Sequence, residues 1–345
     1  MVSMKQGWIK ASALAIAGAV LLAGCGGKDD KTGNASPGAS ANAEGGKPTK
    51  VTLVLDWTPN TNHTGLYVAK EQGLWEKRGL DVEIIQPPEA GSSALVASGK
   101  AEFGVGAQEG MIQARGQGLP LVSIAPIIQH NTSGFASPAD RGIKEPKDFE
   151  GKTYGGWNSP AEEAVISSMM NVQGADAKKV NFVSAGSADF FSAVKNGIDF
   201  EWIFYGWTGI EAELRKEPIN MVYLTDYSKE LDYYTPLLMT SEKMIKDKPD
   251  VVRAFLAGAS EGYQYAISNP DDAADILLKA VPELGADLVK ASQKWLSPKY
   301  QDDAPRWGEQ KREVWSGYGE WLKNNGLLDK DLDYDAMFTN EFLPK

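Results

Sequence analysis

The chain has 345 residues, of which 35 are Lys or Arg and 46 are Asp or Glu, so its formal net charge is −11 at pH 7. An acidic chain without a Lys/Arg-rich run is not expected to bind nucleic acid. The sequence contains one Cys, which excludes an internal disulfide and a cysteine-based metal site within the chain.

The first residues have the features of a secretory signal. Two lysines precede an apolar run over 11–23, which is too short to span a bilayer because a membrane helix needs roughly 20 residues. The sequence LAGC at 22–25 follows and resembles the bacterial lipobox, in which the signal is cut before the Cys and the thiol is lipidated. We therefore expect a signal peptide over 1–24 and a lipid on Cys25 that holds the protein on the membrane, outside the cytoplasm. The alternative is an N-terminal membrane anchor or a buried core helix.

The next stretch is expected to be a tether. Residues 26–50 include no Val, Ile, Leu, Met or aromatic residue. They cannot bury enough apolar area to offset the entropy of ordering, so we expect 25–50 to comprise the lipidated Cys and a flexible linker. The remaining residues, 51–345, exceed the size at which one hydrophobic core keeps growing, and this predicts two lobes.

From residue 51 onward, an apolar strand, a turn and an amphipathic helix follow one another repeatedly. The pattern predicts strands over 51–57, 80–86, 103–106 and 121–128, and helices over 63–72, 92–98 and 109–117. The same order restarts at residue 151, with strands over 152–155, 180–184, 198–204 and 220–224, and helices over 160–172, 188–196 and 208–216. The continuous apolar run over 121–128 is typical of a strand buried on both faces in a parallel sheet. After residue 239 the chain is expected to be mainly helical.

This alternation predicts an α/β protein with two lobes, each a doubly wound sheet, joined by crossing strands. We place lobe 1 at 51–132 and 238–345, lobe 2 at 133–237, and the crossings near 128–136 and 234–240. Ligands of such sheets bind beside the carboxyl ends of strands, near helix N-termini. The ligand cleft is therefore expected to be lined by the loops 57–63, 106–110, 155–162, 184–188 and 205–208.

The loop DWTPNTNH at 56–63 opens a stretch that resembles a known family. The similar segments are LDWTPNTNHTGLYVAKEQGLWEKRGLDVEI at 55–84, ASGKAEFGV at 97–105, ARGQGLPLVSIA at 114–125, DFEGKTYGGW at 148–157 and KPDVVRAFLAGASEGYQYAISNPDDAA at 248–274. They resemble the thiamine-precursor family, which includes pyrimidine-binding proteins of the periplasmic type and the fungal pyrimidine synthase. The segments ASGKAEFGV and KPDVVRAFL are shared with sulfonate-, nitrate- and riboflavin-precursor-binding relatives, so they support the fold more than the ligand.

The resemblance implies a type II periplasmic-binding-protein fold and a transport role. The implied ligand is an aminopyrimidine, N-formyl-4-amino-5-aminomethyl-2-methylpyrimidine, which is a salvaged breakdown product of thiamine. The implied partners are an ABC permease and its ATPase. A riboflavin precursor or an alkylsulfonate remains an alternative ligand, although a sulfonate site needs Arg, Ser and helix N-termini, whereas these loops carry aromatic residues and carboxylates.

The family also implies an enzyme as an alternative. The fungal synthase uses its own His, a Lys-bound pyridoxal phosphate and a Cys-rich iron-binding motif. The corresponding stretches here read GVGAQEG at 104–110 and ELDYYTP at 230–236, without Lys, His or Cys. No other catalytic motif is found. We therefore expect a monomeric receptor with no catalytic residue, cofactor or metal.

A flat aminopyrimidine needs stacking rings and a carboxylate for its amine. The strand-end loops supply four aromatic residues for stacking, namely Trp57, Trp157, Tyr205 and Trp207. The candidate carboxylates are Glu109, Glu162 and Glu211. We favour Glu211 or Glu162, although its place in the first turn of a helix explains Glu162 equally well.

The remaining candidates come from the same loops and from the crossings. Asn60 and His63 are expected to contact the ligand, whereas Asn62 is expected to cap the following helix. His130 is expected to be a hinge or surface residue rather than a ligand contact. The other candidate contacts are Gln108, Ser159 and Tyr234, of which Tyr234 precedes a predicted crossing.

Overall fold

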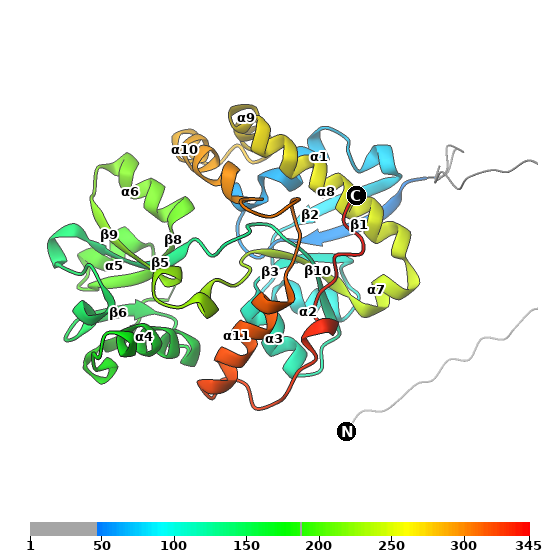
Figure 1. The fold of residues 1–345 in the computed structure, drawn as a ribbon. Helices are drawn as coiled ribbons and strands as arrows, with labels where there is room; N and C mark the ends of the chain where they lie inside the picture. Colours follow the sequence, from blue (N-terminus) through cyan, green and yellow to red (C-terminus); the bar gives the residue numbers. More distant parts are fainter. Residues whose placement is uncertain (1–46, 187) are drawn as a thin grey trace, which may run out of the picture. The chain divides into compact units, whose positions relative to one another are not determined.

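The computed structural model describes residues 47–186 and 188–345 (Figure 1). The expected signal peptide, Cys25 and all but the last four residues of the expected tether lie outside the described residues. Residues 47–345 form one compact unit. Within the described part of this unit, no helix is both long and apolar enough to cross a membrane.

The first sheet has five strands in the order β2-β1-β3-β10-β4. Their bounds are Thr49–Val54 for β1, Leu80–Ile85 for β2, Phe103–Gly106 for β3, Leu121–Pro126 for β4 and Leu237–Ser241 for β10. β1 pairs in parallel with β2 and β3, whereas β10 is antiparallel to β3 and β4. Leu238 enters one hydrophobic core, and its neighbours Leu237 and Met239 enter another. Because side chains alternate along a strand, both faces of the sheet are buried, as a doubly wound sheet requires.

Eight helices surround or follow the strands of this first sheet. Their bounds are Thr64–Glu71 for α1, Gly91–Ala97 for α2, Gln108–Gly116 for α3, Glu242–Asp247 for α7, Pro249–Ser268 for α8, Pro270–Ala280 for α9, Ala286–Leu296 for α10 and Arg312–Asn324 for α11. α1 and α8 cover one face, and α2, α3 and α11 supply apolar residues to the core of the other face (Figure 1). A Cβ atom at Gly262 of α8 would collide with the backbone oxygen of Gly65 in α1. Glycine therefore allows the backbones of α1 and α8 to approach closely.

The second sheet repeats the plan of the first, with the order β7-β6-β8-β5-β9. Its strands are β5 (Ser133–Pro138), β6 (Thr153–Gly156), β7 (Asn181–Ser184), β8 (Phe200–Phe204) and β9 (Ile219–Tyr223). Its helices are α4 (Pro160–Val172), α5 (Phe190–Lys195) and α6 (Ile210–Arg215). α4 packs with Phe135 and Phe200 on one face, and α5 packs with Ala136 and Ile203 on the other. The prediction of an α/β protein with two doubly wound lobes is confirmed.

In each sheet, the first strand that the chain forms after crossing from the other sheet is antiparallel to its neighbours. The chain leaves β4 at Pro126 and enters β5 at Ser133, and it later leaves the second sheet to enter β10 at Leu237. β5 is antiparallel to β8 and β9, and β10 is antiparallel to β3 and β4. Two connections therefore run between the sheets. The first spans 127–132, and the second, here called the return segment, spans 224–236.

The structure corrects two expectations about single elements. The run at 121–128 forms β4, which pairs antiparallel with β10 at the end of the strand order rather than inside a parallel sheet. β4 is buried because the C-terminal segment covers it, where the Ser123 N–H donates to the Met337 oxygen at 2.8 Å. The helix expected over 208–216 instead starts as a π-helical turn, Tyr205–Gly209, and continues as α6.

Candidate functional site

A cavity of about 540 Å³ lies where the strand-end loops of both sheets meet. The loop after β1 forms one wall, and β8 with the following π-helical turn and the start of α5 forms the opposite wall. A smaller cavity of about 160 Å³ lies at the ends of β6 and β7, beside the middle of β8. The two cavities share five lining residues, namely Trp57, Trp157, Ala188, Glu201 and Trp202, so they are compartments of one cleft.

Aromatic rings line this cleft from both lobes. The side chains of Trp57 and Trp157 are 57% and 62% exposed and line both compartments. Trp207 lines the larger compartment, as predicted for a strand-end loop. Large aromatic side chains usually bury most of their surface, so two exposed indoles beside one cavity are available to stack on a flat ligand.

The charge of the cleft has one sign. The larger compartment is lined by four carboxylates, namely Asp56, Asp189, Glu201 and Glu211, and by no Lys, Arg or His among its described residues. Such a surface attracts hydrogen-bond donors and cations and repels anions. No group of three or more metal-ligating side chains occurs within the described ranges 47–186 and 188–345.

Glu201 is the carboxylate that the sequence analysis missed. It lies on β8, is only 8% exposed and lines both compartments. Burial, with a contribution from the nearby charge of Asp189, raises the pKa of Glu201 to about 7. Its carboxylate has no hydrogen-bond partner among the described residues, and its oxygens are not among the fully buried unpartnered atoms, so they open onto the cleft. The available signal was a Glu inside a stretch, 198–204, that is predicted as a buried strand.

Glu211, one of the two favoured carboxylates, does line the larger compartment. Its carboxylate pairs with Arg215, one helical turn further along α6. Because Arg215 neutralises part of its charge, the carboxylate of Glu211 is less available as an acceptor in the cleft than the unpaired carboxylate of Glu201.

Glu162, the other favoured carboxylate, is committed to the protein. It accepts hydrogen bonds from the Tyr154 hydroxyl at 2.9 Å, from the Trp157 N–H at 3.1 Å and from the Ser159 N–H at 2.9 Å. Ser159 in turn caps α4 through its side chain, which completes a capping box. The structure therefore places Glu162 and Ser159 as supports of the loop that carries Trp157. Glu162 also lines the smaller compartment, whereas Ser159 does not line the cleft.

Gln108 and Tyr234 also lie outside the cavity wall. The Gln108 side chain accepts the Tyr234 N–H at 2.9 Å and donates to the Val314 oxygen at 3.0 Å. The Tyr234 hydroxyl accepts the Lys311 N–H at 2.9 Å. Gln108 and Tyr234 therefore tie the start of α3 to the connection that precedes β10, and this explains their burial.

Glu109 and Tyr205 are not brought into the cleft either. Glu109 is half-buried, and its burial, together with the charge of Glu162, raises its pKa. The Tyr205 hydroxyl donates to Glu213, and its ring lies 5.3 Å from that of Trp295 in α10. Tyr205 thus contacts the first lobe through α10 rather than the ligand cavity.

The loop after β1 differs from its prediction in two details. Asn60, not Asn62, is the cap: its side chain accepts the Asn62 N–H at 2.9 Å, and Asn60 and Asn62 both line the larger compartment. His63 is fully buried, accepts the Asn60 N–H at 3.2 Å through Nδ1 and contacts Asp56 Oδ1 at 2.8 Å through Nε2. The expectation that His63 lines the cavity is therefore wrong, because its ring is turned into the loop and the loop hides it.

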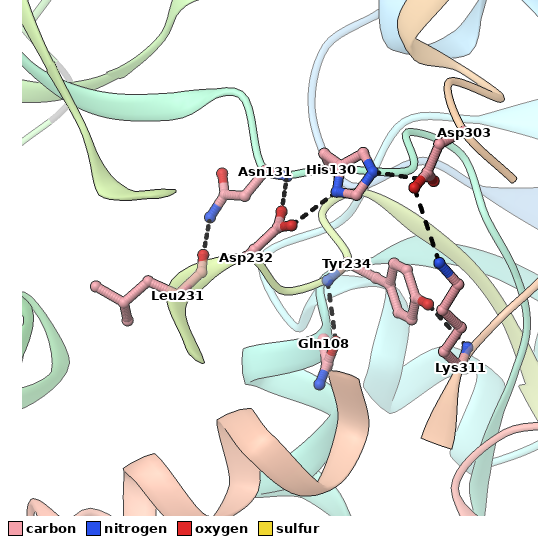
Figure 2. A network of polar contacts seen from close by, with 8 residues as sticks. All are labelled: Gln108, His130, Asn131, Leu231, Asp232, Tyr234, Asp303 and Lys311. Atoms are coloured by element: carbon pink, nitrogen blue, oxygen red, sulfur yellow. Dashed lines mark hydrogen bonds and ion pairs between the residues drawn. The ribbon is translucent and has the colours of Figure 1, made fainter. Parts of the chain in front are cut away.

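His130 lies in the first connection between the sheets (Figure 2). Its Nδ1 lies 2.7 Å from Asp232 in the return segment, and its Nε2 lies 3.2 Å from Asp303. The Asn131 N–H donates to the other oxygen of Asp232 at 2.8 Å, and the Asn131 side chain donates to the Leu231 oxygen at 2.9 Å. The two connections are thus joined side by side, as the hinge interpretation of His130 expects.

This network predicts a pH effect. Hydrogen bonds to Asp232 and Asp303, of which that to Asp232 contributes most, raise the pKa of His130 from 6.5 to about 9. Because the pKa of His130 is higher in the folded state, its protonated form stabilises the fold. This stabilisation is fully present below the unfolded pKa of 6.5 and is lost as the pH rises through about 9. We expect wild type to be more stable than His130→Gln at pH 6 and nearly equal at pH 10, as measured by urea unfolding.

The difference at pH 6 is expected to be about 1 kcal/mol or less, because all three side chains are partly exposed and water screens them. An equal difference at both pH values would contradict this role for His130.

A family model described as NMT1/THI5 like matches residues 60–273. The chain belongs to the NMT1/THI5-like family. The match confirms the resemblance to the thiamine-precursor family. It begins at Asn60, the cap residue at the end of the loop after β1, and covers both connections between the sheets and α8.

Two known relatives are similar to this chain over most of its length and most of theirs. The formylaminopyrimidine-binding protein of Halalkalibacterium halodurans is 27% identical, over 84% of this chain and 89% of its own. The 4-amino-5-hydroxymethyl-2-methylpyrimidine phosphate synthase of Legionella pneumophila is 23% identical, over 86% of this chain and 92% of its own. The relatives of this chain thus include both a binding protein and a synthase.

Solved structures of similar fold include periplasmic binding proteins and a desulfurization enzyme. The alkanesulfonate-binding protein of Xanthomonas axonopodis pv. citri, bound to MOPS, has a TM-score of 0.65 at 12% identity and covers 86% of this chain and 99% of its own. Likeness at this identity concerns the backbone alone. The chain therefore has the periplasmic-binding-protein fold, as predicted.

Proposed function

We propose that this chain is the solute-binding component of an ABC importer and captures a thiamine-related aminopyrimidine, N-formyl-4-amino-5-aminomethyl-2-methylpyrimidine, for salvage. The observation that carries the proposal is Glu201, a buried carboxylate without a partner among the described residues, in a cleft lined by indole rings. An aminopyrimidine has flat apolar faces for Trp57 and Trp157, and an exocyclic amine that donates to Glu201. The formylaminopyrimidine-binding relative supports the choice of ligand.

The size of the cleft and the connections between the lobes support this role. The larger compartment, at about 540 Å³, lies in the size range of small-molecule sites. The connection at 127–132 and its return segment, joined by His130 and Asp232, are where the lobes would hinge around a ligand. The complex would then be presented to a membrane permease driven by an ATPase.

The lining of the cleft argues against an anionic ligand. A sulfonate or nitrate needs positive groups, whereas the described lining of the larger compartment is acidic. A riboflavin precursor, which is also flat, is the alternative ligand, and this chain has a riboflavin-binding relative in Chloroflexus aurantiacus at 23% identity.

A receptor is also favoured over a synthase. The stretch that corresponds to the synthase Lys and His, 104–110, runs from β3 into the start of α3 and holds neither residue, and its Gln108 is bonded to Tyr234. We therefore propose a monomeric binding protein without catalytic residues. Its proposed place is outside the cytoplasm, held on the membrane by a lipid on Cys25 after removal of the signal peptide 1–24.

A thermal-shift experiment tests the ligand. The formylated aminopyrimidine at 100 times its Kd is expected to stabilise the purified protein by about 2.7 kcal/mol. The melting temperature is measured with this compound, the hydroxymethyl pyrimidine, thiamine, riboflavin and taurine. A shift with riboflavin or taurine alone would show that the pyrimidine assignment is wrong.

A further inference from the structure

We infer that His63 is a positioning residue that orients Asp56 as a second ligand-contacting carboxylate of the cleft. The inference rests on the proposed function, since it names a second group that would hold the same ligand. It assigns His63 an effect on binding without contact with the ligand.

The hydrogen bonds of His63 fix its tautomer. The Asn60 N–H donates to Nδ1 at 3.2 Å, so Nδ1 must carry a lone pair rather than a proton. The single ring proton is then on Nε2, which donates to Asp56 Oδ1 at 2.8 Å. Because His63 is fully buried, water cannot replace either bond. The ring therefore acts as a fixed donor to one oxygen of Asp56.

Asp56 stands between this donor and the cavity. Its side chain is 31% exposed and lines the larger compartment beside Trp57. Only Oδ1 has a side-chain partner among the described residues, which leaves Oδ2 as an acceptor for a ligand. Asp56 comes from the first lobe and Glu201 from the second, so each wall of the cleft offers a free acceptor group.

The loop that carries Asp56 and His63 is held on its far side. The Tyr300 hydroxyl donates to the Thr61 oxygen at 2.6 Å, and the Tyr263 hydroxyl of α8 donates to the Asn62 oxygen at 2.8 Å. Groups held by several bonds lose little freedom on binding, and this favours affinity. A ligand with two separate N–H groups would donate one hydrogen bond to Asp56 and one to Glu201. The proposed pyrimidine has two such groups, its ring amine and its formylated aminomethyl nitrogen.

Two matched variants separate positioning from structural support. In His63→Asn, the side-chain oxygen can replace Nδ1 as the acceptor for Asn60, but the donor to Asp56 is lost. In His63→Gln, the side-chain nitrogen can replace Nε2 as the donor to Asp56, but the acceptor for Asn60 is lost. We expect His63→Asn to weaken binding of the formylated aminopyrimidine about tenfold, and His63→Gln to stay within about threefold of wild type although it melts at a lower temperature.

The Kd values from calorimetry and the melting temperatures without ligand decide the outcome. If affinity follows stability, so that His63→Gln binds worse than His63→Asn, His63 only supports the loop and the inference is overturned. Asp56→Asn is expected to weaken binding about as much as His63→Asn. The double variant is expected to be no worse than either single one, because both changes remove the same interaction.

A ligand-free measurement keeps this inference separate from the proposed function. If wild type binds no aminopyrimidine, the proposed function fails and Asp56 loses its assigned ligand. The orienting role of His63 is then judged by imidazole ¹⁵N NMR of the purified protein, in which the chain's two His residues give few signals. A proton on Nε2 alone supports the orienting role, and a proton on Nδ1 overturns it.

Discussion

Replacing Glu201 with Gln is expected to weaken binding of the aminopyrimidine about tenfold to a hundredfold, the range for losing a charge-assisted hydrogen bond of about 1.5–3 kcal/mol. Gln keeps the size of the side chain but removes the negative charge that the ligand amine would meet. Glu201 has no protein partner among the described residues, so its replacement breaks no hydrogen bond of the described fold. The Kd is measured by calorimetry at pH 8, where the wild-type carboxyl is mainly ionised.

Without ligand, Glu201→Gln is expected to keep or raise the free energy of unfolding, although the variant loses affinity for the ligand. Because burial raises the pKa of Glu201 from 4.5 to about 7, the folded state binds its proton more tightly than the unfolded state. The free energy of unfolding contributed by this group therefore falls as the pH rises from 4.5 through about 7, and Glu201→Gln lacks that fall. At pH 8 the variant is expected to be at least as stable as wild type in urea unfolding.

Glu163→Gln is the matched control for this experiment. Glu163 is exposed in the first turn of α4 and does not line the cleft, so its variant should bind like wild type. Unchanged affinity in Glu201→Gln, with normal loss of affinity in a tryptophan variant, would mean that the ligand donates to another carboxylate.

Trp157→Ala and Trp57→Ala are each expected to weaken binding about tenfold to a hundredfold, since stacking a base on an aromatic ring contributes about 1–3 kcal/mol. Both indoles are more than half exposed and neither belongs to a hydrophobic core. The free energy of unfolding without ligand is therefore expected to change by only about 0.5 kcal/mol. Calorimetry and urea unfolding on the same protein samples give the two quantities.

Leu214→Ala is the control for loss of an exposed apolar side chain, because Leu214 is 45% exposed and lies outside the cleft. It is expected to leave the Kd unchanged. A large loss of stability in Trp57→Ala or Trp157→Ala would show that the ring packs in the fold. Equal Kd values for both tryptophan variants and wild type would exclude stacking.

The elements were predictable because their signals are local. The helix at 160–172 and the strand at 103–106 have the predicted bounds, since Pro, Ser and Gly mark their ends within a few residues. The pairing of 121–128 was not predictable, because a continuous apolar run records burial and not the direction of a neighbouring strand. β4 is covered by the segment around Met337, more than two hundred residues later in the chain.

The candidate site was predictable in part for the same reason. Trp57, Trp157 and Trp207 reach the cleft because they follow strands, and the position of strand ends can be read from the sequence. Glu162 and His63 carry the right chemical groups, but their hydrogen bonds are used by the loops themselves. Whether a polar group is free for a ligand depends on partners that only folding brings together.

The sequence by itself determined the family, the two α/β lobes and four of the five loops expected at the cleft, because motifs, periodicity and strand ends are properties of neighbouring residues. The fifth loop, 106–110, contributes no residue to the cleft. Only the tertiary structure decided which carboxylate is available. Glu201 becomes free and poorly solvated because β8 lies between β6 and β5, beside a cavity shared by both lobes. Burial and the absence of a partner arise from the whole packing around one side chain, which no local pattern records.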